Sequence, residues 1–344
     1  MINTGIFSSR HRMSKFKSIW RTTGPNETIQ LPVIAPYVID WGDGIETSTE
    51  TSHEYAIAGD YTIKITGVIT DFVFNNSGDK LKILEVQQFG GMTEIKSASF
   101  FGCSNLDITA EEKLNAGISL LNAFNGNSSL VYNPSINLLD TSLTQNMIGV
   151  FQGDSLFNNS IGNWVLSACI TISAILRETS IFNQNLDSWD VSNVTDTSSA
   201  FQSSFLFNSP LNSWVTSSFV LCTAMFRAAF DFNQPLFNWD VSNVENMSLM
   251  FDQAFDFDQD LSSWDFSSVK NMSNFMKSKS AANYSTTNMD ALLNRLDDAT
   301  FGLNFAIATN VNVSFGSINY TSAGSAALAS LVSKGYVISI GVQV

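Results

Sequence analysis

A fixed repeat period is the feature of this sequence that most constrains how the chain folds. Tryptophan recurs at every twenty-fifth position in five successive repeats, as Trp164, Trp189, Trp214, Trp239 and Trp264. Phenylalanine follows the same spacing seven positions earlier, and an aliphatic residue follows it three positions earlier. Several columns in register over five repeats predict a repeat protein, because one unit cannot bury its own large apolar side chains and stacked units can.

The length of the unit and its apolar pattern indicate the kind of repeat. A unit of 25 residues falls within the range of about 20–29 residues of leucine-rich repeats and is short for paired helices. In residues 236–241 the pattern L-x-x-W-x-V predicts a strand whose Leu, Trp and Val point inward, while Asn238 and Asp240 face solvent. The apolar spacing of three and four in residues 247–251 indicates a short helical or 3₁₀ turn that closes each coil.

Both ends of the array are predicted to be caps. Alternating apolar residues around Gly42-Asp43-Gly44 predict a β-hairpin, followed by a strand in which Tyr61, Ile63 and Ile65 share one buried face. After the array, helical periodicity covers residues 288–303 and 322–334, with strands expected at 311–315 and 336–344. Such caps cover the apolar side chains and strand edges that an open array would expose.

We therefore predict a mainly β chain with four parts. These are an N-terminal arm at 1–15, an antiparallel β cap at 16–80, a leucine-rich-repeat-type β-solenoid at 81–285, and an α/β capping unit at 286–344.

The motifs also resemble a known family. The coil L-x-x-W-D-V-S-N-V-x-N-M-S-x-M-F is similar to the BspA-like leucine-rich repeat of surface proteins in Bacteroidetes and mycoplasmas. The segment I-D-W-G-D-G…H-E-Y…G-D-Y-T-I-K-I-T-G resembles a PKD-like β unit, and M-D-A-L-L…Y-T-S-A-G-S-A-A-L-A-S-L-V-S-K-G-Y-V-I-S resembles the cap found behind such repeats. The resemblance covers about residues 16–340. It implies adhesion or surface display and carries over no active site.

Charge and hydropathy exclude some partners. With 17 basic and 31 acidic side chains the net charge is −14, which repels phosphate backbones, so we expect no nucleic-acid partner. No apolar run approaches the ~20 residues of a membrane span, so we expect no membrane insertion. The first residues also lack the apolar stretch of a signal peptide, so we expect no cleaved secretory signal.

The residues that most often carry catalysis or bind metals are few. Of the two histidines, His11 and His53, the second is predicted to be structural within the β cap. Asp40 and Asp43 offer carboxylates for a calcium ion, but an Asp-Gly turn needs no metal, and we favour the turn and expect no cofactor. The three cysteines show no ligand spacing and are predicted to be small buried residues; they are Cys103, Cys169 and Cys222.

Two sets of acidic residues stand out in the array. For the first, we favour a solvated turn face with Asx hydrogen bonds over a metal site; its members are Asp252, Asp256, Asp258 and Asp260. The second is a column on the exposed strand face, formed by Asp190, Asp240 and Asp265. Stacked carboxylates repel one another, so this column is either tolerated by solvent or matched by a basic partner, and it is a candidate binding face. The tryptophan columns point inward, which favours core packing over carbohydrate stacking.

These observations lead to a non-enzymatic interaction protein in one of two settings. The first is a bacteriophage virion component that decorates the capsid or belongs to a head fibre or tail. There the basic residues Arg10, Arg12, Lys15 and Lys17 would anchor an arm while the acidic body projects outward. The alternative is a bacterial cell-surface adhesin of the BspA-like type. Partners would be other virion proteins, or a protein or glycan on a host surface, and edge-to-edge pairing of flat polar strands leaves a homo-oligomer open.

Overall fold

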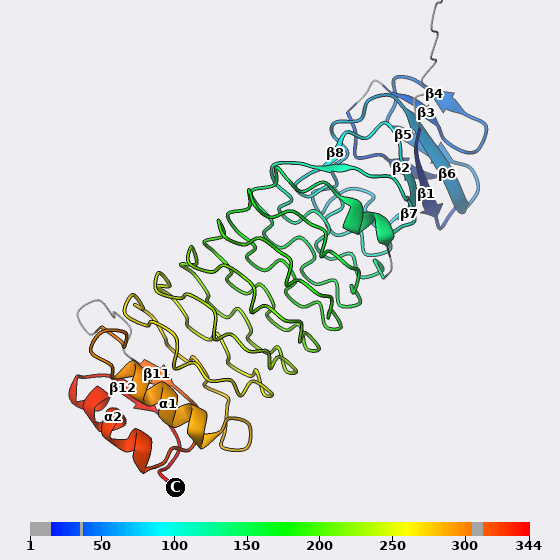
Figure 1. Cartoon of the computed structure of the whole chain (residues 1–344). Coiled ribbons are helices and arrows are strands. Elements are labelled where there is room, and N and C mark those ends of the chain that lie inside the picture. The colour runs from blue at the N-terminus through cyan, green and yellow to red at the C-terminus, as the bar shows by residue number, and fades with distance from the viewer. Residues whose placement is uncertain (1–14, 35–36, 132, 305–311) are drawn as a thin grey trace, which may run out of the picture.

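The computed structural model describes residues 15–34, 37–131, 133–304 and 312–344. It shows an elongated stack of coils, with a β-sheet unit at the N-terminal end and a unit with two helices at the C-terminal end (Figure 1). Strands outnumber helices, so the prediction of a mainly β chain is confirmed. One hydrophobic core runs without interruption from the first sheet through the stack to the last helix.

The N-terminal unit is built around a six-stranded sheet in the order β4-β3-β6-β1-β7-β9. Its central strand, β1, buries alternate side chains, including Phe16 and Trp20, and pairs antiparallel with both β6 and β7. A two-stranded sheet of β2 and β5 lies beside it. The strands are β1 (Phe16–Thr22), β2 (Glu27–Gln30), β3 (Val38–Asp40), β4 (Glu46–Thr47), β5 (Ser52–Tyr55), β6 (Gly59–Thr66), β7 (Ile83–Phe89) and β9 (Asp107–Ile108).

The predicted hairpin at Gly42-Asp43-Gly44 is confirmed, because β3 and β4 pair antiparallel on either side of it. Gly42 has a φ of +84°, and a Cβ there would lie 2.6 Å from the carbonyl oxygen of Thr62. Glycine suits this position for two reasons: it adopts a positive φ readily, and it has no Cβ to clash with the carbonyl of Thr62.

The sheet also joins the N-terminal unit to the stack. Strand β7 pairs antiparallel with β1 on one side and parallel with β9 on the other. The sheet thus continues beyond residue 80, where the sequence predicted a boundary, and the first coil is an extension of it. Two further short strands, β8 (Glu94–Ile95) and β10 (Asn115–Ala116), pair in parallel, and a 3₁₀ helix follows at Pro134–Leu138.

Parallel contacts at the same position of each repeat hold successive coils together. Isolated parallel bridges link positions one repeat apart, through Asn146, Thr171, Asp196, Leu221, Asn246 and Asn271. In the coil after Asn246, the N–H groups of Met247, Leu249 and Phe251 each donate to a carbonyl of the next coil at 2.9 Å. Alternate backbone groups of this segment therefore form the ladder between coils.

The position of that ladder corrects two local predictions. Residues 236–241 form no ladder strand, because the N–H of Trp239 donates to the carbonyl of Leu236 within a turn at 3.1 Å. Residues 247–251 do form a turn, since the N–H of Met250 donates to the carbonyl of Met247 at 3.2 Å, but the turn is not helical, because Leu249 has a φ of +61° and its N–H bonds to the next coil. A left-handed residue turns its amide out of the local turn and toward the neighbouring coil. The inward orientation of Leu236, Trp239 and Val241 is confirmed, since all three are buried.

Aromatic columns fill the inside of the stack. Rings one repeat apart are nearly parallel, with centroids 5.9–6.2 Å apart from Phe157 to Phe232. The tryptophans from Trp189 to Trp264 stack with centroids 6.2–6.3 Å apart. Each coil buries ring surface of its neighbours, and each fully buried large apolar side chain contributes about 1.5–3 kcal/mol.

The C-terminal unit closes the stack. Its elements are α1 (Thr286–Leu296), β11 (Asn312–Ser314), α2 (Ser322–Ser333) and β12 (Val337–Ser339). The order of elements is as expected from the sequence, but α1 ends seven residues before 303 and β12 covers three of the nine residues expected at 336–344. The side chains of Ser285 and Thr321 cap the two helices, as serine and threonine commonly do. Arg295 of α1 binds back to the stack by donating from Nε to the carbonyl of Trp264 at 2.5 Å.

Candidate functional site

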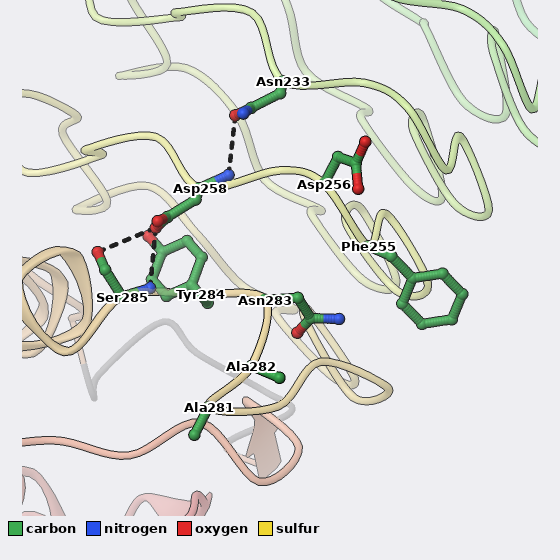
Figure 2. Close-up of a pocket in the computed structure, with 9 residues that line it drawn as sticks. All are labelled: Asn233, Phe255, Asp256, Asp258, Ala281, Ala282, Asn283, Tyr284 and Ser285. Carbon is green, nitrogen blue, oxygen red and sulfur yellow. Dashed lines mark hydrogen bonds between the residues drawn. The ribbon is translucent and has the colours of Figure 1, made fainter.

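A pocket lies where the last coil meets the C-terminal unit (Figure 2). It has a volume of about 560 Å³ and is lined on one side by Asn233, Phe255, Asp256 and Asp258 of the coils. Residues 281–285 of the connecting segment line the other side. We call this cavity the junction pocket. It exists because the chain leaves the regular repeat here and turns into α1.

Asp258 in this pocket is the last member of a side-chain ladder. Asn158, Asn183, Asn208 and Asn233 each accept, through Oδ1, the N–H of the residue one repeat later at 2.9–3.0 Å. Asp258 continues the pattern by accepting the N–H of Ser285 at 2.9 Å. It also accepts from the Ser285 hydroxyl and the Asn288 side chain. The carboxylate of Asp258 therefore fastens the C-terminal unit to the stack.

Asp256 differs from Asp258 in having no such role. Its side chain is exposed, and among the described residues no hydrogen bond or ion pair reaches its carboxylate. In Figure 2 its carboxylate and the exposed ring of Phe255, the residue before it, extend from the same turn in different directions. A free carboxylate and an exposed aromatic ring at the mouth of a pocket form a surface that suits a cation with an apolar or planar part.

A buried lysine lies next to this pocket. The ammonium of Lys279 donates to the carbonyl oxygens of Ala254, Phe255 and Phe257 at 2.6–3.0 Å. Burial lowers the pKa of Lys279 to about 7, while the charges of Asp258 and Asp256 act in the opposite direction. Its three protons match the three carbonyls, so Lys279 ties residues 254–257 to the segment after the last coil.

The other members of the predicted acidic cluster have separate partners. Asp252 is buried, pairs with Arg227 at 3.2 Å and accepts the N–H of Ser278. Asp260 accepts the N–H of Ser262 at 2.8 Å, which is an Asx turn. Across residues 15–34, 37–131, 133–304 and 312–344, the structure forms no group of three or more His, Cys, Asp or Glu that could hold a metal ion.

The acidic column of the sequence analysis forms local turns. Asp190 and Asp240 are exposed, Asp265 is half-buried, and Val215 occupies the same repeat position between the first two. Each carboxylate accepts the N–H of the residue two positions on, at 2.9–3.2 Å. This hydrogen bond gives each aspartate a structural role within its own coil, in addition to the charge that it presents.

The basic arm falls mostly outside the described residues. Arg10 and Arg12 lie there, so the structure does not test their anchoring role. Lys15 is exposed and its charge contributes to lowering the pKa of Asp40, whereas Lys17 is a half-buried residue of β1.

Both aspartates considered for calcium bind side chains of the N-terminal unit. Asp40 pairs with Lys64 at 2.9 Å, and that ammonium lowers the pKa of the carboxyl. Asp43 pairs with Nε2 of His53 at 2.7 Å, and the imidazole stacks on Trp41. Burial acts to raise the pKa of Asp43, but the hydrogen bonds from His53 and from the N–H of Ile45 lower it more. His53 thus joins β5 to the hairpin.

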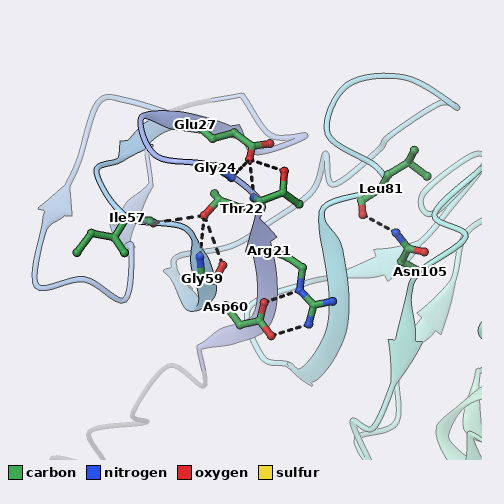
Figure 3. A network of polar contacts seen from close by, with 10 residues as sticks. Arg21, Thr22, Gly24, Glu27, Ile57, Gly59, Asp60, Leu81 and Asn105 are labelled. Atoms are coloured by element: carbon green, nitrogen blue, oxygen red, sulfur yellow. Dashed lines mark hydrogen bonds and ion pairs between the residues drawn. The ribbon is translucent and has the colours of Figure 1, made fainter.

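A second pocket, of about 500 Å³, lies between the N-terminal unit and the first coils. Figure 3 shows the polar network beside it, in which Arg21 pairs with Asp60 through two hydrogen bonds of 2.7 and 2.8 Å. Lys82, which also lines the pocket, pairs with Glu27 at 3.0 Å. Both cations of this pocket have a direct ion-pair partner, whereas Asp256 in the junction pocket has none among the described residues.

The cysteines are buried and free, as expected for small apolar residues. Burial raises the pKa of each thiol, which makes the reactive thiolate scarce at neutral pH.

Comparison with known proteins finds one family. A family model described as "Mycoplasma protein of unknown function, DUF285" matches residues 118–228 and 206–289. The two matches together run from 118 to 289, which is half of the chain. The chain belongs to this family. No curated protein and no solved structure matches it.

The family match covers the regular coils and all the residues that line the junction pocket, and it ends before α1 is complete. No helix among the described residues has the length and apolar character needed to cross a membrane.

Sequence reasoning missed two features at the junction. Phe205, Phe230 and Phe255 recur with the repeat period on the outer edge of the coils, and that column is visible in the sequence. Lys279 continues a column of small buried residues that includes Ala229 and Ala254, so its buried position could have been inferred from register. The hydrogen bonds from its ammonium to carbonyls of the preceding coil could not be inferred from the sequence.

Proposed function

We propose that this chain is a non-enzymatic interaction protein whose coils form a leucine-rich-repeat-type β-solenoid and present a surface to a partner. The observation that carries the proposal is the regular ladder of parallel bridges, one in each repeat from Asn146 to Asn271. Such a ladder makes a rigid, elongated body whose outward side chains keep fixed spacings. Rigid repeat surfaces suit binding, because little conformational entropy is lost when a partner docks.

The arrangement of polar groups supports binding rather than catalysis. In the junction pocket the carboxylate of Asp258 is bound to Ser285 and Asn288, which leaves Asp256 without a second free carboxylate beside it. In the N-terminal unit His53 is held by Asp43 and stacked on Trp41. General acid–base chemistry needs groups that are free to exchange protons with a substrate.

Within the family, we propose that the coils are BspA-like and the N-terminal sheet is PKD-like. The match to the Mycoplasma family supports the first part. The antiparallel pairing of β1, β3 and β6, with the Asp-Gly hairpin at its edge, supports the second. The division at 16–80, 81–285 and 286–344 stays part of this proposal, with β7 and β9 of the second part completing the sheet of the first.

We propose that the chain is displayed on a bacteriophage particle, which is then its carrier, with the bacterial cell surface as the alternative. The contrast between the basic residues near the N-terminus and a body of net charge −14 supports anchoring through the arm. The family match supports a bacterial protein, as the alternative requires, because the family description names Mycoplasma, a bacterium.

Mass spectrometry of purified particles and of washed cell envelopes from the source culture separates the carriers. The intact chain is expected in particles, and deletion of residues 1–15 is expected to reduce its incorporation. Recovery from envelopes alone would replace the phage proposal with the adhesin. Recovery from neither, with the chain as a free soluble protein, would contradict the display function itself.

A further inference from the structure

An apolar ridge runs along one edge of the stack and remains open to solvent. It is formed by two adjacent positions of the turn that recurs in five successive coils: an aliphatic position in the earlier coils, and the position just before it, which is phenylalanine in the later coils. The members are Leu156, Ile181, Phe205, Leu206, Phe230 and Phe255. Leu156, Leu206 and Phe255 are 47%, 45% and 38% exposed, although the stack already buries a full set of aromatic columns inside. An apolar stripe that the core does not need is typical of an interaction surface.

Ring stacking and backbone hydrogen bonds hold the turns of the ridge next to one another. The rings of Phe205 and Phe230 stack with centroids 4.7 Å apart, and those of Phe230 and Phe255 with centroids 5.3 Å apart. The N–H groups of Leu206, Asp231 and Asp256 donate to carbonyls of the preceding coil at 2.9–3.2 Å, which fixes these turns side by side. With about 4.8 Å between coils, five coils span about 20 Å, which matches about six residues of extended chain at ~3.3 Å each.

The charge at one end of the ridge is negative. Asp231 follows Phe230, and Asp256 follows Phe255 at the mouth of the junction pocket. The residues that line the pocket include no lysine or arginine. The ammonium of nearby Lys279 is buried against three backbone carbonyls and does not neutralise the mouth by direct contact. A ligand at this end of the ridge therefore meets an exposed aromatic ring and, on the next residue, a carboxylate without a direct partner among the described residues.

We propose that the ridge and the junction pocket dock an extended basic segment of a partner protein. Its apolar side chains lie along the ridge, and an arginine or lysine side chain enters the pocket between the Phe255 ring and the Asp256 carboxylate. A guanidinium suits both groups, because it stacks on aromatic rings and binds carboxylates. The net charge of −14 also attracts a basic segment over longer distances. This inference rests on the proposed function as an interaction protein.

Selection of random displayed heptapeptides on the immobilised full chain tests the proposal. We expect enriched peptides to combine apolar residues with an arginine or lysine at one end. A synthetic copy of the best peptide should bind at least about tenfold more tightly than the same peptide with citrulline in place of arginine, since citrulline keeps the shape and loses the charge. A higher salt concentration should lower the affinity of the arginine peptide and leave the affinity of the citrulline peptide nearly unchanged.

Matched variants locate the binding site. Phe255→Ala and Asp256→Asn should each lower the affinity for the arginine peptide by about tenfold or more. Asp260→Asn removes a nearby carboxylate that is bound to Ser262, and Phe237→Ala removes an exposed ring that lies outside the ridge. Both controls should leave the affinity unchanged. Asp256→Asn is isosteric at an exposed site, so its loss of binding cannot be ascribed to unfolding.

Three outcomes would overturn the inference. Enriched peptides without basic residues, or binding that ignores Phe255→Ala and Asp256→Asn, would exclude this site. Capture of a neutral oligosaccharide that depends on Phe255, without any basic peptide, would assign the ridge to a glycan. Self-association that Phe255→Ala abolishes would assign it to a second copy of the chain. In each case recovery of the chain from particles or envelopes would leave the display function standing.

Discussion

At the scale of single residues, the repeat tryptophans join neighbouring coils through their indole nitrogens. In each of the five regular coils the indole Nε1 donates to a backbone carbonyl of the preceding coil at 2.8–3.0 Å. The donor bonds to the carbonyl 28 positions earlier each time. A leucine at this position would fill the core but leave that carbonyl without a partner, which explains why the position is tryptophan.

The first prediction concerns Trp239, whose indole donates to the carbonyl of Leu211 at 2.9 Å. Trp239→Phe keeps an aromatic ring and removes the donor, so we expect a loss of about 1–3 kcal/mol in the free energy of unfolding. Urea denaturation followed by circular dichroism measures it. Leu236→Met, a buried change without a polar group, serves as control and should cost less than about 1.5 kcal/mol. Equal losses in both variants would show that the hydrogen bond contributes nothing of its own.

The second prediction concerns Asp154, which is buried and whose Oδ1 accepts the N–H of Asn127 at 2.5 Å. Burial raises the pKa of Asp154 well above its usual value. The folded state then holds a proton that the unfolded state releases above about pH 4, so this group lowers stability as the pH rises from there toward its folded pKa. Asp154→Asn keeps the acceptor and has no charge to desolvate.

We expect the thermal unfolding midpoint of Asp154→Asn, measured relative to that of the wild type, to rise as the pH increases from 4 to 8. The control is Asp140→Asn, because hydrogen bonds from Ser142 and the pairing with Lys113 lower the pKa of that carboxyl. A carboxyl whose folded-state pKa is lowered stabilises the folded protein once it is ionised. The control variant, which lacks this carboxyl, should therefore be less stable than the wild type above about pH 4. A constant difference between Asp154→Asn and the wild type would contradict a buried, protonated Asp154.

At the scale of the element, two left-handed positions shape each coil. The first position is Gly149, then Ala174, Ser199, Ala224, Leu249 and Asn274 in later coils, all with φ between +53° and +61°. The second position is four residues further on. In both columns glycine gives way to residues that adopt this region less readily, at a cost of about 1–2 kcal/mol per residue. The coil backbone therefore tolerates strain because the hydrogen bonds between coils require it.

The third prediction follows from that column. Ser199 has a φ of +57°, so Ser199→Gly should stabilise the chain by about 1 kcal/mol, because the strain disappears. The neighbouring residue Ser198 does not have a positive φ. Ser198→Gly should therefore destabilise the folded chain by about 0.5–1 kcal/mol, because glycine loses more backbone entropy on folding. Denaturation midpoints of the two variants should move in opposite directions. Movement in the same direction would show that backbone strain at 199 is not released.

At the scale of the whole molecule, each coil contacts its two neighbours and the aromatic columns pass through all of them. The bridges, the tryptophan bonds and the side-chain ladder all join positions about one repeat apart. The stability of such a stack is approximately a sum of coils and the interfaces between them. Only the two ends differ, where β7 and β9 join the N-terminal sheet and Asp258 and Lys279 hold the C-terminal unit.

The fourth prediction tests this modular character. Deletion of residues 206–230 removes one whole repeat, and residue 232 then takes the place of residue 207 in the phenylalanine column. We expect a folded chain with the same signal per residue in circular dichroism and a modestly lower thermal midpoint. Deletion of residues 206–217 removes half a repeat and puts every later column out of register, so that variant should fail to fold. Similar stability of the two deletions would mean that column register does not hold the stack together.

Several features of this protein follow from its sequence alone. The repeat period, the inward orientation of Leu236, Trp239 and Val241, the Gly42-Asp43-Gly44 hairpin and both C-terminal helices depend on local patterns or on register between repeats. Such patterns are readable because the same physical environment recurs in each unit. The burial of the cysteines belongs to the same class.

Other features are decided only by the tertiary structure. The segment that forms the ladder between coils was predicted in the wrong place, because its hydrogen-bond partners lie almost a full repeat away and its left-handed turns have no strong residue preference. The different roles of Asp256 and Asp258 were also hidden, since two aspartates in one turn look alike until the C-terminal unit binds one of them. The junction pocket exists only where two differently folded parts meet, and no local pattern describes such a meeting.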